Sequence, residues 1–161
     1  MPVSNSGDLY LLRHGIAQER IGGLDHAERA LTEKGRLRTT AMAHLLVQRG
    51  VSADVIVTSP FRRALETAQI ALQAGLAPVL DVDDALQPGG DGASVLRRAE
   101  RAICLVGHEP DLSGLASRLL GLRPGAIALR KAGLIHLSKV GGQWDLQALL
   151  RPGLLLDLEP C

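Results

Sequence analysis

The chain has 161 residues, 46% of them hydrophobic and 22% charged, with a formal net charge of +1 at pH 7. These values are typical of one globular domain that buries a sizeable core. We therefore predict a single domain over residues 1–161, with a core at about 8–150 and a C-terminal tail at 151–161. The near-neutral charge and the scarcity of aromatic residues argue against nucleic-acid and anionic membrane partners.

Export and membrane signals are not evident in the sequence. No apolar run approaches the roughly 18 residues that a membrane-spanning helix needs. The N-terminus does not combine a basic segment with an apolar stretch, as a secretory signal does. Cys104 and Cys161 are too few for a disulfide framework and do not form a metal-binding pattern. We therefore expect a cytoplasmic protein.

The first predicted strand leads directly into polar residues. Leu9–Leu12 is a short apolar run that predicts a buried strand, and Arg13, His14 and Gly15 follow it. Ligands of an open α/β sheet bind beyond the carboxyl ends of its strands, where these residues would lie. From these residues alone, the stretch is either an anion site with an imidazole in it or a polar strand end that turns. A polar loop is predicted over residues 16–30.

Two strand-and-helix units follow this loop. Thr32 is a plausible N-cap for a helix that ends near Gly50. Residues 54–58 form a second apolar, β-branched run that predicts a strand. The next helix is expected to begin with Ser59 as its N-cap and Pro60 at its first helical position.

Two arginines occupy the first turn of this second predicted helix. There the helix dipole disfavours Arg62 and Arg63 by a few tenths of a kcal/mol to about 1 kcal/mol. A helix N-terminus that follows a strand already favours anions, and arginine raises its positive potential further. The pair therefore suits a phosphate or another multivalent anion. The alternative is a surface pair that carries a weak penalty.

The second half of the chain contains another buried strand and a second histidine at a strand end. Residues 78–82 predict a short strand, placed at a sheet edge because it begins with proline. An acidic loop rich in Gly and Pro follows at 83–92, and a short helix is expected at about 93–101. Residues 102–107 are a continuous apolar run, typical of a central strand, that ends at His108.

The C-terminal part of the sequence changes to strands. We expect them at 126–129, 133–137 and 143–149, the last two joined by a hairpin turn at Gly141-Gly142. His136 lies inside one of these strands and is interpreted as a packing or hydrogen-bonding residue. The predicted fold is α/β, a three-layer α/β/α sandwich with a mainly parallel central sheet and antiparallel strands toward the C-terminus.

Arginine and histidine side chains thus follow three predicted strands. Because βα units place strand ends on the same side of a sheet, Arg13, His14, Arg63 and His108 should meet there. Arginine binds phosphate through paired hydrogen bonds, and a neutral imidazole can attack phosphorus and carry the phosphoryl group. The remaining cations would stabilise the transition state, so the site needs no Mg²⁺ or other cofactor.

Three motifs in this order resemble those of a known family: Leu12-Arg13-His14-Gly15, then Ser59-Pro60-x-x-Arg63-Ala64-x-x-Thr67, then Gly107-His108. The chain resembles the histidine phosphatase (phosphoglycerate mutase-like) superfamily over about residues 8–150. It carries no large insertion between the second and third motifs. In this respect it resembles the compact phosphohistidine phosphatase branch of the SixA type.

The resemblance implies a role for each of the four residues. His14 would be the nucleophile that becomes phosphorylated, and Arg13 and Arg63 would bind the phosphoryl oxygens. His108 would contact the phosphate and stabilise the group in transfer. A phosphate or sulfate ion would occupy the same site. Water would then hydrolyse the phosphohistidine intermediate.

The acid that would protonate the leaving group stays open at this point. Asp83, Asp84 and Asp91 in the acidic loop and Glu109 beside His108 are the candidates. A protonated phosphohistidine substrate would need little acid help, because a neutral imidazole leaves easily.

The leading hypothesis is therefore a phosphatase that removes the phosphoryl group from phosphohistidine on a phosphotransfer protein, as part of signal transduction. The short chain offers little to close over a small molecule, and an open site admits a side chain that projects from another protein. One alternative is a phosphatase for small phosphomonoesters such as sugar phosphates. A further alternative is a non-catalytic module that binds phosphate or a partner.

Overall fold

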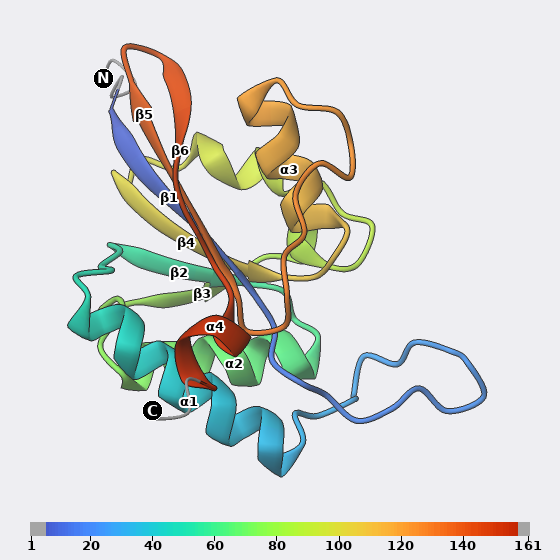
Figure 1. Ribbon diagram of the computed structural model, residues 1–161. Helices are drawn as coiled ribbons and strands as arrows, with labels where there is room; N and C mark the ends of the chain where they lie inside the picture. Colours follow the sequence, from blue (N-terminus) through green and yellow to red (C-terminus); the bar gives the residue numbers. More distant parts are fainter. Residues whose placement is uncertain (1–5, 158–161) are drawn as a thin grey trace.

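The computed structural model describes residues 6–157, which form a six-stranded sheet with helices on both faces (Figure 1). Residues 1–5 and 158–161, with Cys161 and the end of the predicted tail, lie outside the described part. The strands are β1 (Gly7–Arg13), β2 (Val55–Thr58), β3 (Leu80–Val82), β4 (Ala102–Gly107), β5 (Leu134–Val140) and β6 (Gln143–Leu150). The helices are α1 (Glu33–Gln48), α2 (Arg62–Gln73), α3 (Asp111–Leu120) and α4 (Pro152–Leu156), with 3₁₀ turns η1 (Asp84–Leu86) and η2 (Gly92–Arg97).

The sheet has the order β3-β2-β4-β1-β5-β6. Neighbouring strands from β3 to β1 are parallel, whereas β5 is antiparallel to β1 and β6 is antiparallel to β5. β3 lies at one edge and β4 lies inside the sheet, as their sequences predict. The predicted α/β fold, with a mainly parallel sheet and antiparallel strands at the C-terminal end, is confirmed.

The sheet separates two cores, and β1 contributes to both. Leu9 and Leu11 pack in the core that contains residues of α3 and the 3₁₀ turns. Tyr10 and Leu12 pack in the core that contains residues of α1 and α2. Figure 1 shows α1, α2 and α4 on one side of the sheet and α3 on the other. Because β1 is covered on both faces, its sequence is a continuous apolar run rather than an alternating one.

The beginnings of α1 and α2 differ in how well the sequence predicts them. Thr32 caps α1 as expected, because its side chain accepts a hydrogen bond from the Gly35 N–H. The expectation that Ser59 and Pro60 begin α2 is wrong, since the helix begins at Arg62 with Phe61 as its N-cap. The Ser59 hydroxyl accepts the N–H of Phe61 and also contacts His108, a tertiary contact that no local capping rule includes.

Two further expectations are corrected in the second half of the chain. Residues 126–129 do not form a strand, and Ile127 and Leu129 instead pack in the core that contains residues of α3. The helix expected at 93–101 is only the 3₁₀ turn η2, which ends at Arg97 because Arg98 is extended. Within residues 6–157, no helix is both long enough and apolar enough to cross a membrane.

Candidate active site

The carboxyl ends of β1, β2 and β4 converge on one pocket. These parallel strands are neighbours in the sheet, so they bring Arg13, His14, Arg63 and His108 together, as the sequence predicts. The pocket has a volume of about 220 Å³. Its lining consists of Arg13, His14, Ala17, Arg20, Asp25, Arg29, Arg63, Pro88, His108, Glu109 and Lys131.

The hydrogen bonds of His14 define which ring nitrogen carries the proton. Its Nδ1 lies 2.7 Å from the carbonyl oxygen of Gly15, which can only accept, so Nδ1 holds the hydrogen. Its Nε2 lies 3.3 Å from Nε of Arg63, which can only donate, so Nε2 presents a lone pair. The lone pair of a buried imidazole is therefore held beside a guanidinium group at the pocket.

The surroundings of His14 keep this ring neutral. Burial is the largest cause and lowers the pKa of His14 to about 3, while the hydrogen bond to Gly15 opposes that shift. His108, Arg63 and Arg13 lower the pKa further, because like charges disfavour a protonated ring. At neutral pH Nε2 therefore keeps its lone pair, which accepts the Arg63 hydrogen bond and can bond to an electrophile when that hydrogen bond is given up.

Arg63 is buried in the first turn of α2, with its side chain 3% exposed. Besides the bond to His14, its Nη2 pairs with Oδ2 of Asp25 at 2.9 Å, and its Nη1 donates to the carbonyl of His26 at 3.3 Å. A guanidinium group has five N–H donors, so these three bonds leave two of them for an anion. The ion pair with Asp25 thus compensates for the unfavourable interaction of Arg63 with the helix dipole.

Arg13 is the last residue of β1 and also lines the pocket. Its Nη1 donates to the carbonyl oxygen of Leu129 at 2.9 Å, which holds the side chain in place. Its Nε is buried and has no hydrogen-bond partner among the described residues. Since buried donors are almost always paired in folded proteins, an anion in the pocket is a natural partner for this guanidinium group.

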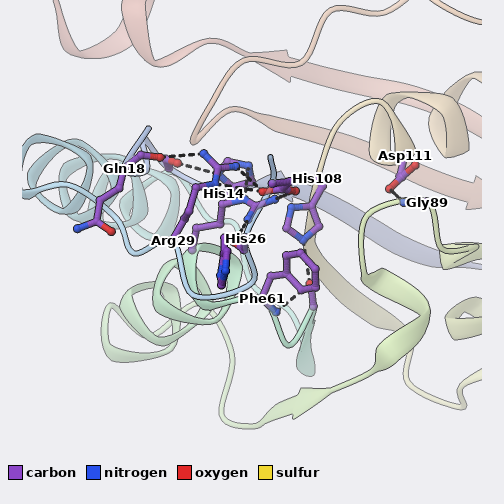
Figure 2. Close-up of polar contacts among 12 residues, drawn as sticks. His14, Gln18, His26, Arg29, Phe61, Gly89, His108 and Asp111 are labelled. Atoms are coloured by element: carbon purple, nitrogen blue, oxygen red, sulfur yellow. Dashed lines mark hydrogen bonds and ion pairs between the residues drawn. The ribbon is translucent and has the colours of Figure 1, made fainter. Parts of the chain in front are cut away.

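His108 follows β4 and is positioned by Ser59 at the end of β2. Its Nε2 lies 2.8 Å from the Ser59 hydroxyl oxygen, and its ring packs edge-on against Phe61, as Figure 2 shows. The ring centre lies 5.3 Å from that of His14. Burial is the main cause that lowers the pKa of His108 to about 4, and the charge of Arg63 adds to it. Its Nδ1 is buried without a partner in the described part of the chain.

Gly15 lets the site residues pack closely against two helices. Its N–H donates to Oγ1 of Thr67 at 3.0 Å, and that hydroxyl donates to the carbonyl of Arg63 at 2.8 Å. A Cβ atom on Gly15 would overlap the hydroxyl oxygen of Thr39 in α1. The Gly15 carbonyl that orients His14 therefore has its position set by α1 and α2 together.

The carboxyl groups considered as the acid do not lie together. Asp83, Asp84 and Asp91 are absent from the pocket lining, and Asp83 and Asp91 instead cap the 3₁₀ turns. Glu109 does line the pocket, but its two oxygens accept hydrogen bonds from the N–H and the hydroxyl of Ser113. Each of these four carboxyl groups thus either lies outside the pocket or already serves a helix start.

Sequence reasoning missed Asp25, which lines the pocket and pairs with both Arg63 and Arg29. Its position depends on the folding of residues 16–31, where the bridge between Ala17 and Leu31 closes the base of the loop. The signal in the sequence was the dipeptide Gly22-Gly23, which is typical of a tight hairpin turn.

The rest of the described chain offers no comparable constellation. Within it, no group of three or more His, Cys, Asp or Glu side chains is placed to hold a metal ion. A larger pocket of about 520 Å³ lies at the opposite end of the sheet, around the start of β1 and residues 96–101. Its lining includes none of the four predicted site residues.

Comparison with known proteins agrees with this geometry. The family model of the histidine phosphatase superfamily (branch 1) matches residues 9–87. An uncharacterised protein of Picosynechococcus sp. strain PCC 7002 is 38% identical over 138 residues, which cover 81% of this chain and 84% of that one. The chain belongs to the histidine phosphatase superfamily. The predicted family is therefore confirmed.

The similar proteins whose names state an activity are more distant. The 2,3-bisphosphoglycerate-dependent phosphoglycerate mutase of Mycobacterium leprae is 36% identical over 74 residues, which cover 45% of this chain and only 30% of the mutase. The protein histidine phosphatase SixA, solved with tungstate, is 21% identical and has a TM-score of 0.80, with 92% of this chain and 99% of SixA covered. The alpha-ribazole phosphatase of Shigella flexneri is 20% identical, with a TM-score of 0.69 and coverage of 90% and 96%. The compact fold of the SixA type is thus shared over nearly the whole chain.

Proposed function

We propose that this protein is a phosphatase that removes the phosphoryl group from phosphohistidine on a phosphotransfer protein, through a covalent intermediate on His14. The observation that carries the proposal is the neutral Nε2 lone pair of His14, buried beside the Arg63 guanidinium at a pocket that Arg13 and His108 also line. Family membership supports phosphatase activity in general. The arrangement of these side chains supports phosphoryl transfer to His14 in particular.

In the proposed first step, Nε2 of His14 attacks phosphorus while the bond from phosphorus to the leaving nitrogen breaks. The electron pair of that bond stays on the leaving imidazole, and Arg13 and Arg63 stabilise the charge on the equatorial oxygens. His108 contributes a further polar contact on the same face. Two guanidinium groups supply the positive charge that metal ions provide in other phosphoryl-transfer sites, so we propose that the reaction does not depend on a metal.

In the proposed second step, water attacks the phosphoryl group on His14. Because Nδ1 keeps its hydrogen through the bond to the Gly15 carbonyl, the phosphorylated ring is a cationic imidazolium, which is a good leaving group. The bond from Nε2 to phosphorus breaks, its electron pair returns to Nε2, and dihydrogen phosphate is released. The neutral ring with its original tautomer is restored without an external base for His14.

The preference for a nitrogen-linked substrate rests on the carboxyl groups. An ester oxygen needs a proton as it leaves, whereas an imidazole can leave as a neutral molecule if it is protonated beforehand. Glu109 and Asp25 line the pocket, but both are engaged in hydrogen bonds or ion pairs. A substrate that needs no acid fits such a pocket. The substrate class implies a role in cytoplasmic phosphotransfer signalling.

A direct comparison of substrates tests this proposal. We would measure kcat/KM on a histidine-containing phosphotransfer domain phosphorylated with phosphoramidate, and on p-nitrophenyl phosphate and a panel of sugar phosphates, with and without EDTA. We expect the phosphoprotein to be preferred by at least tenfold, with EDTA having no effect. His14→Ala should abolish turnover and the acid-labile labelling of the enzyme. A clear preference for an ester would contradict the proposal, as would phosphate binding without any turnover.

A phosphatase for small phosphomonoesters is the second candidate. The observation that favours it is the pair of exposed cations on the pocket lining, Arg20 and Lys131, which could hold a second anionic group of a small substrate. Proteins of the same fold include the alpha-ribazole phosphatase of Shigella flexneri and a mycobacterial glucosyl-3-phosphoglycerate phosphatase. The substrate panel above separates the two candidates, because only the second predicts preference for a small ester.

A further inference from the structure

Residues 17–31 form an arm that leaves the body of the protein beside the candidate active site (Figure 1). Two antiparallel bridges define it, Ala17 with Leu31 at its base and Ile21 with Leu24 at its tip. The turn at the tip is Gly22-Gly23, where both residues have positive φ angles of 62° and 75°.

The tip of this arm carries the two most exposed large hydrophobic side chains of the described residues. Ile21 is 83% exposed and Leu24 is 72% exposed, and the bridge places them next to each other. Single apolar residues on a surface are ordinary, but a neighbouring pair held away from the core is not explained by folding. Their exposure is a cost unless another molecule covers them.

The arm is held in position by contacts of residues outside its tip. Arg29 donates to the carbonyl of Gln18 at 2.8 Å and pairs with Asp25 at 2.8 Å, as Figure 2 shows for the first of these contacts. Asp25 in turn pairs with Arg63 in the site, and the N–H of Arg62 donates to the carbonyl of Ala27 at 2.9 Å. The tip therefore has a defined position relative to the pocket.

The base of the arm and the pocket form one continuous surface. Ala17, Arg20, Asp25 and Arg29 line the pocket, whereas Ile21 and Leu24 do not. A small molecule that fills the pocket would leave the tip uncovered, and only a partner larger than the pocket can contact both. The pocket lining carries five cationic side chains and two carboxylates, so the surface around the phosphoryl site suits an acidic partner.

We propose that the arm is a docking surface for the protein that carries the phosphohistidine. Ile21 and Leu24 contact an apolar patch on that protein, its acidic surface faces Arg20 and Lys131, and its phosphohistidine enters the pocket. This inference rests on the proposed function and adds the surface through which a protein substrate is distinguished from a small one. Apolar side chains at the centre of an interface commonly contribute most of its affinity.

The test is a double variant, Ile21→Ser with Leu24→Ser, and a matched control, Val140→Ser. Val140 is 66% exposed and precedes the Gly141-Gly142 turn of the β5–β6 hairpin, at the opposite end of the sheet. Each protein is assayed on the phosphorylated phosphotransfer domain and on free phosphohistidine. We expect the double variant to lose at least tenfold in kcat/KM on the domain, mainly through KM, and less than twofold on free phosphohistidine. The control should change neither value by more than twofold.

Three outcomes would overturn the docking proposal. Equal losses on both substrates would mean that the arm only supports the site. No loss on the domain would mean that the arm does not contact it. A change of oligomeric state in the double variant, measured by light scattering, would mean that the tip covers a second copy of the chain. Failure of the proposed function itself is seen separately, because the wild-type enzyme would then prefer the esters.

Discussion

His14 directly follows β1 and His136 lies on the adjacent strand β5, yet the two rings have neighbours of opposite charge. His136 on β5 faces a carboxylate, with its Nε2 2.8 Å from Oδ1 of Asp8, and stacks on Tyr10 with ring centres 4.4 Å apart. His14 faces a guanidinium group, and its other ring nitrogen is occupied by a backbone carbonyl. The guanidinium groups beside His14 favour its neutral form, because like charges disfavour a protonated ring.

The difference teaches how one residue type acquires two roles in the same fold. His136 lies inside β5, paired with Tyr10 in the middle of β1, and Asp8 gives its ring a polar partner within the protein. The end of the sheet that holds His14 and His108 gathers cations and leaves polar atoms of Arg13 and His108 without partners in the described chain. We propose that an anion from outside completes only this second arrangement.

The strongest way to break this comparison is to replace His108 at the candidate site and His136 inside β5 by asparagine, each in its own variant. His108→Asn removes a ring from the candidate site, and we expect kcat to fall by about 10²–10³-fold, the usual effect of losing one contact to a developing oxyanion. His136→Asn should leave kcat within about twofold and only lower the melting temperature. Steady-state kinetics and thermal unfolding of both variants check this, and comparable activity losses would show that the two histidines are not functionally distinct.

The next prediction concerns Gly15, whose carbonyl sets the tautomer of His14. In Gly15→Ala the new Cβ overlaps the Thr39 hydroxyl, so we expect a loss of about 1–3 kcal/mol in the free energy of unfolding and at least a tenfold loss in kcat. The Thr39 hydroxyl is buried and unpartnered among the described residues, so Thr39→Ala alone should cost little.

The double variant of Gly15→Ala with Thr39→Ala tests the physical cause. Removing the hydroxyl makes room for the new methyl group, and we expect most of the lost stability and part of the activity to return. Denaturant unfolding and kinetics of the two single variants and the double variant form the cycle. Additive losses would show that the defect arises from the backbone of Gly15 rather than from the overlap with Thr39.

A smaller effect is expected at Ser59, which holds the His108 ring. Ser59→Ala removes the 2.8 Å contact to Nε2, and we expect a loss in kcat of about threefold to tenfold because the ring is no longer fixed. Ser117→Ala is the control, since Ser117 is also buried but its hydroxyl has no partner in residues 6–157. A loss in kcat of the same size in both variants would exclude a positioning role for Ser59.

Some residues of the candidate site could be predicted from the sequence and others could not, for a physical reason. Arg13, His14 and His108 each follow a continuous apolar run, and the parallel arrangement of such strands brings their ends together whatever the details of the loops. The mainly parallel sheet and the pocket could therefore be predicted, and the resemblance of the three motifs indicated the family. The roles that we assign to the four predicted residues still depend on the kinetic tests above.

Asp25 and Ser59 could not be placed in the same way. Asp25 reaches Arg63 only because of how the arm folds, which depends on two isolated bridges and on contacts of Arg29 with Gln18 and Asp25. Ser59 has the local pattern of a helix cap, and its hydroxyl does accept the N–H of Phe61 at 3.2 Å, but it also contacts a histidine 49 positions away. Contacts of this kind follow from tertiary packing, which spacing rules do not contain.

The smallest predicted effect is on stability as a function of pH. Burial lowers the pKa of His14 to about 3 and that of His108 to about 4, from an unfolded value near 6.5. Between pH 6.5 and about 4 the unfolded chain therefore binds protons that the folded chain does not. The free energy of unfolding should fall as pH decreases through this window, by at most about 1.4 kcal/mol per pH unit for each ring. Above the window, the contribution of the two rings to stability is fully present.

Replacing both rings by glutamine isolates this effect. In the His14→Gln, His108→Gln double variant, the free energy of unfolding should depend less on pH from 6.5 to 5 than it does in the wild type. Carboxyl groups in ion pairs, such as Glu100 whose pKa Arg98 lowers, titrate at lower pH and affect both proteins alike. Urea unfolding at several pH values measures the slopes. Equal slopes in both proteins would contradict the neutral rings on which the proposed phosphoryl transfer to His14 depends.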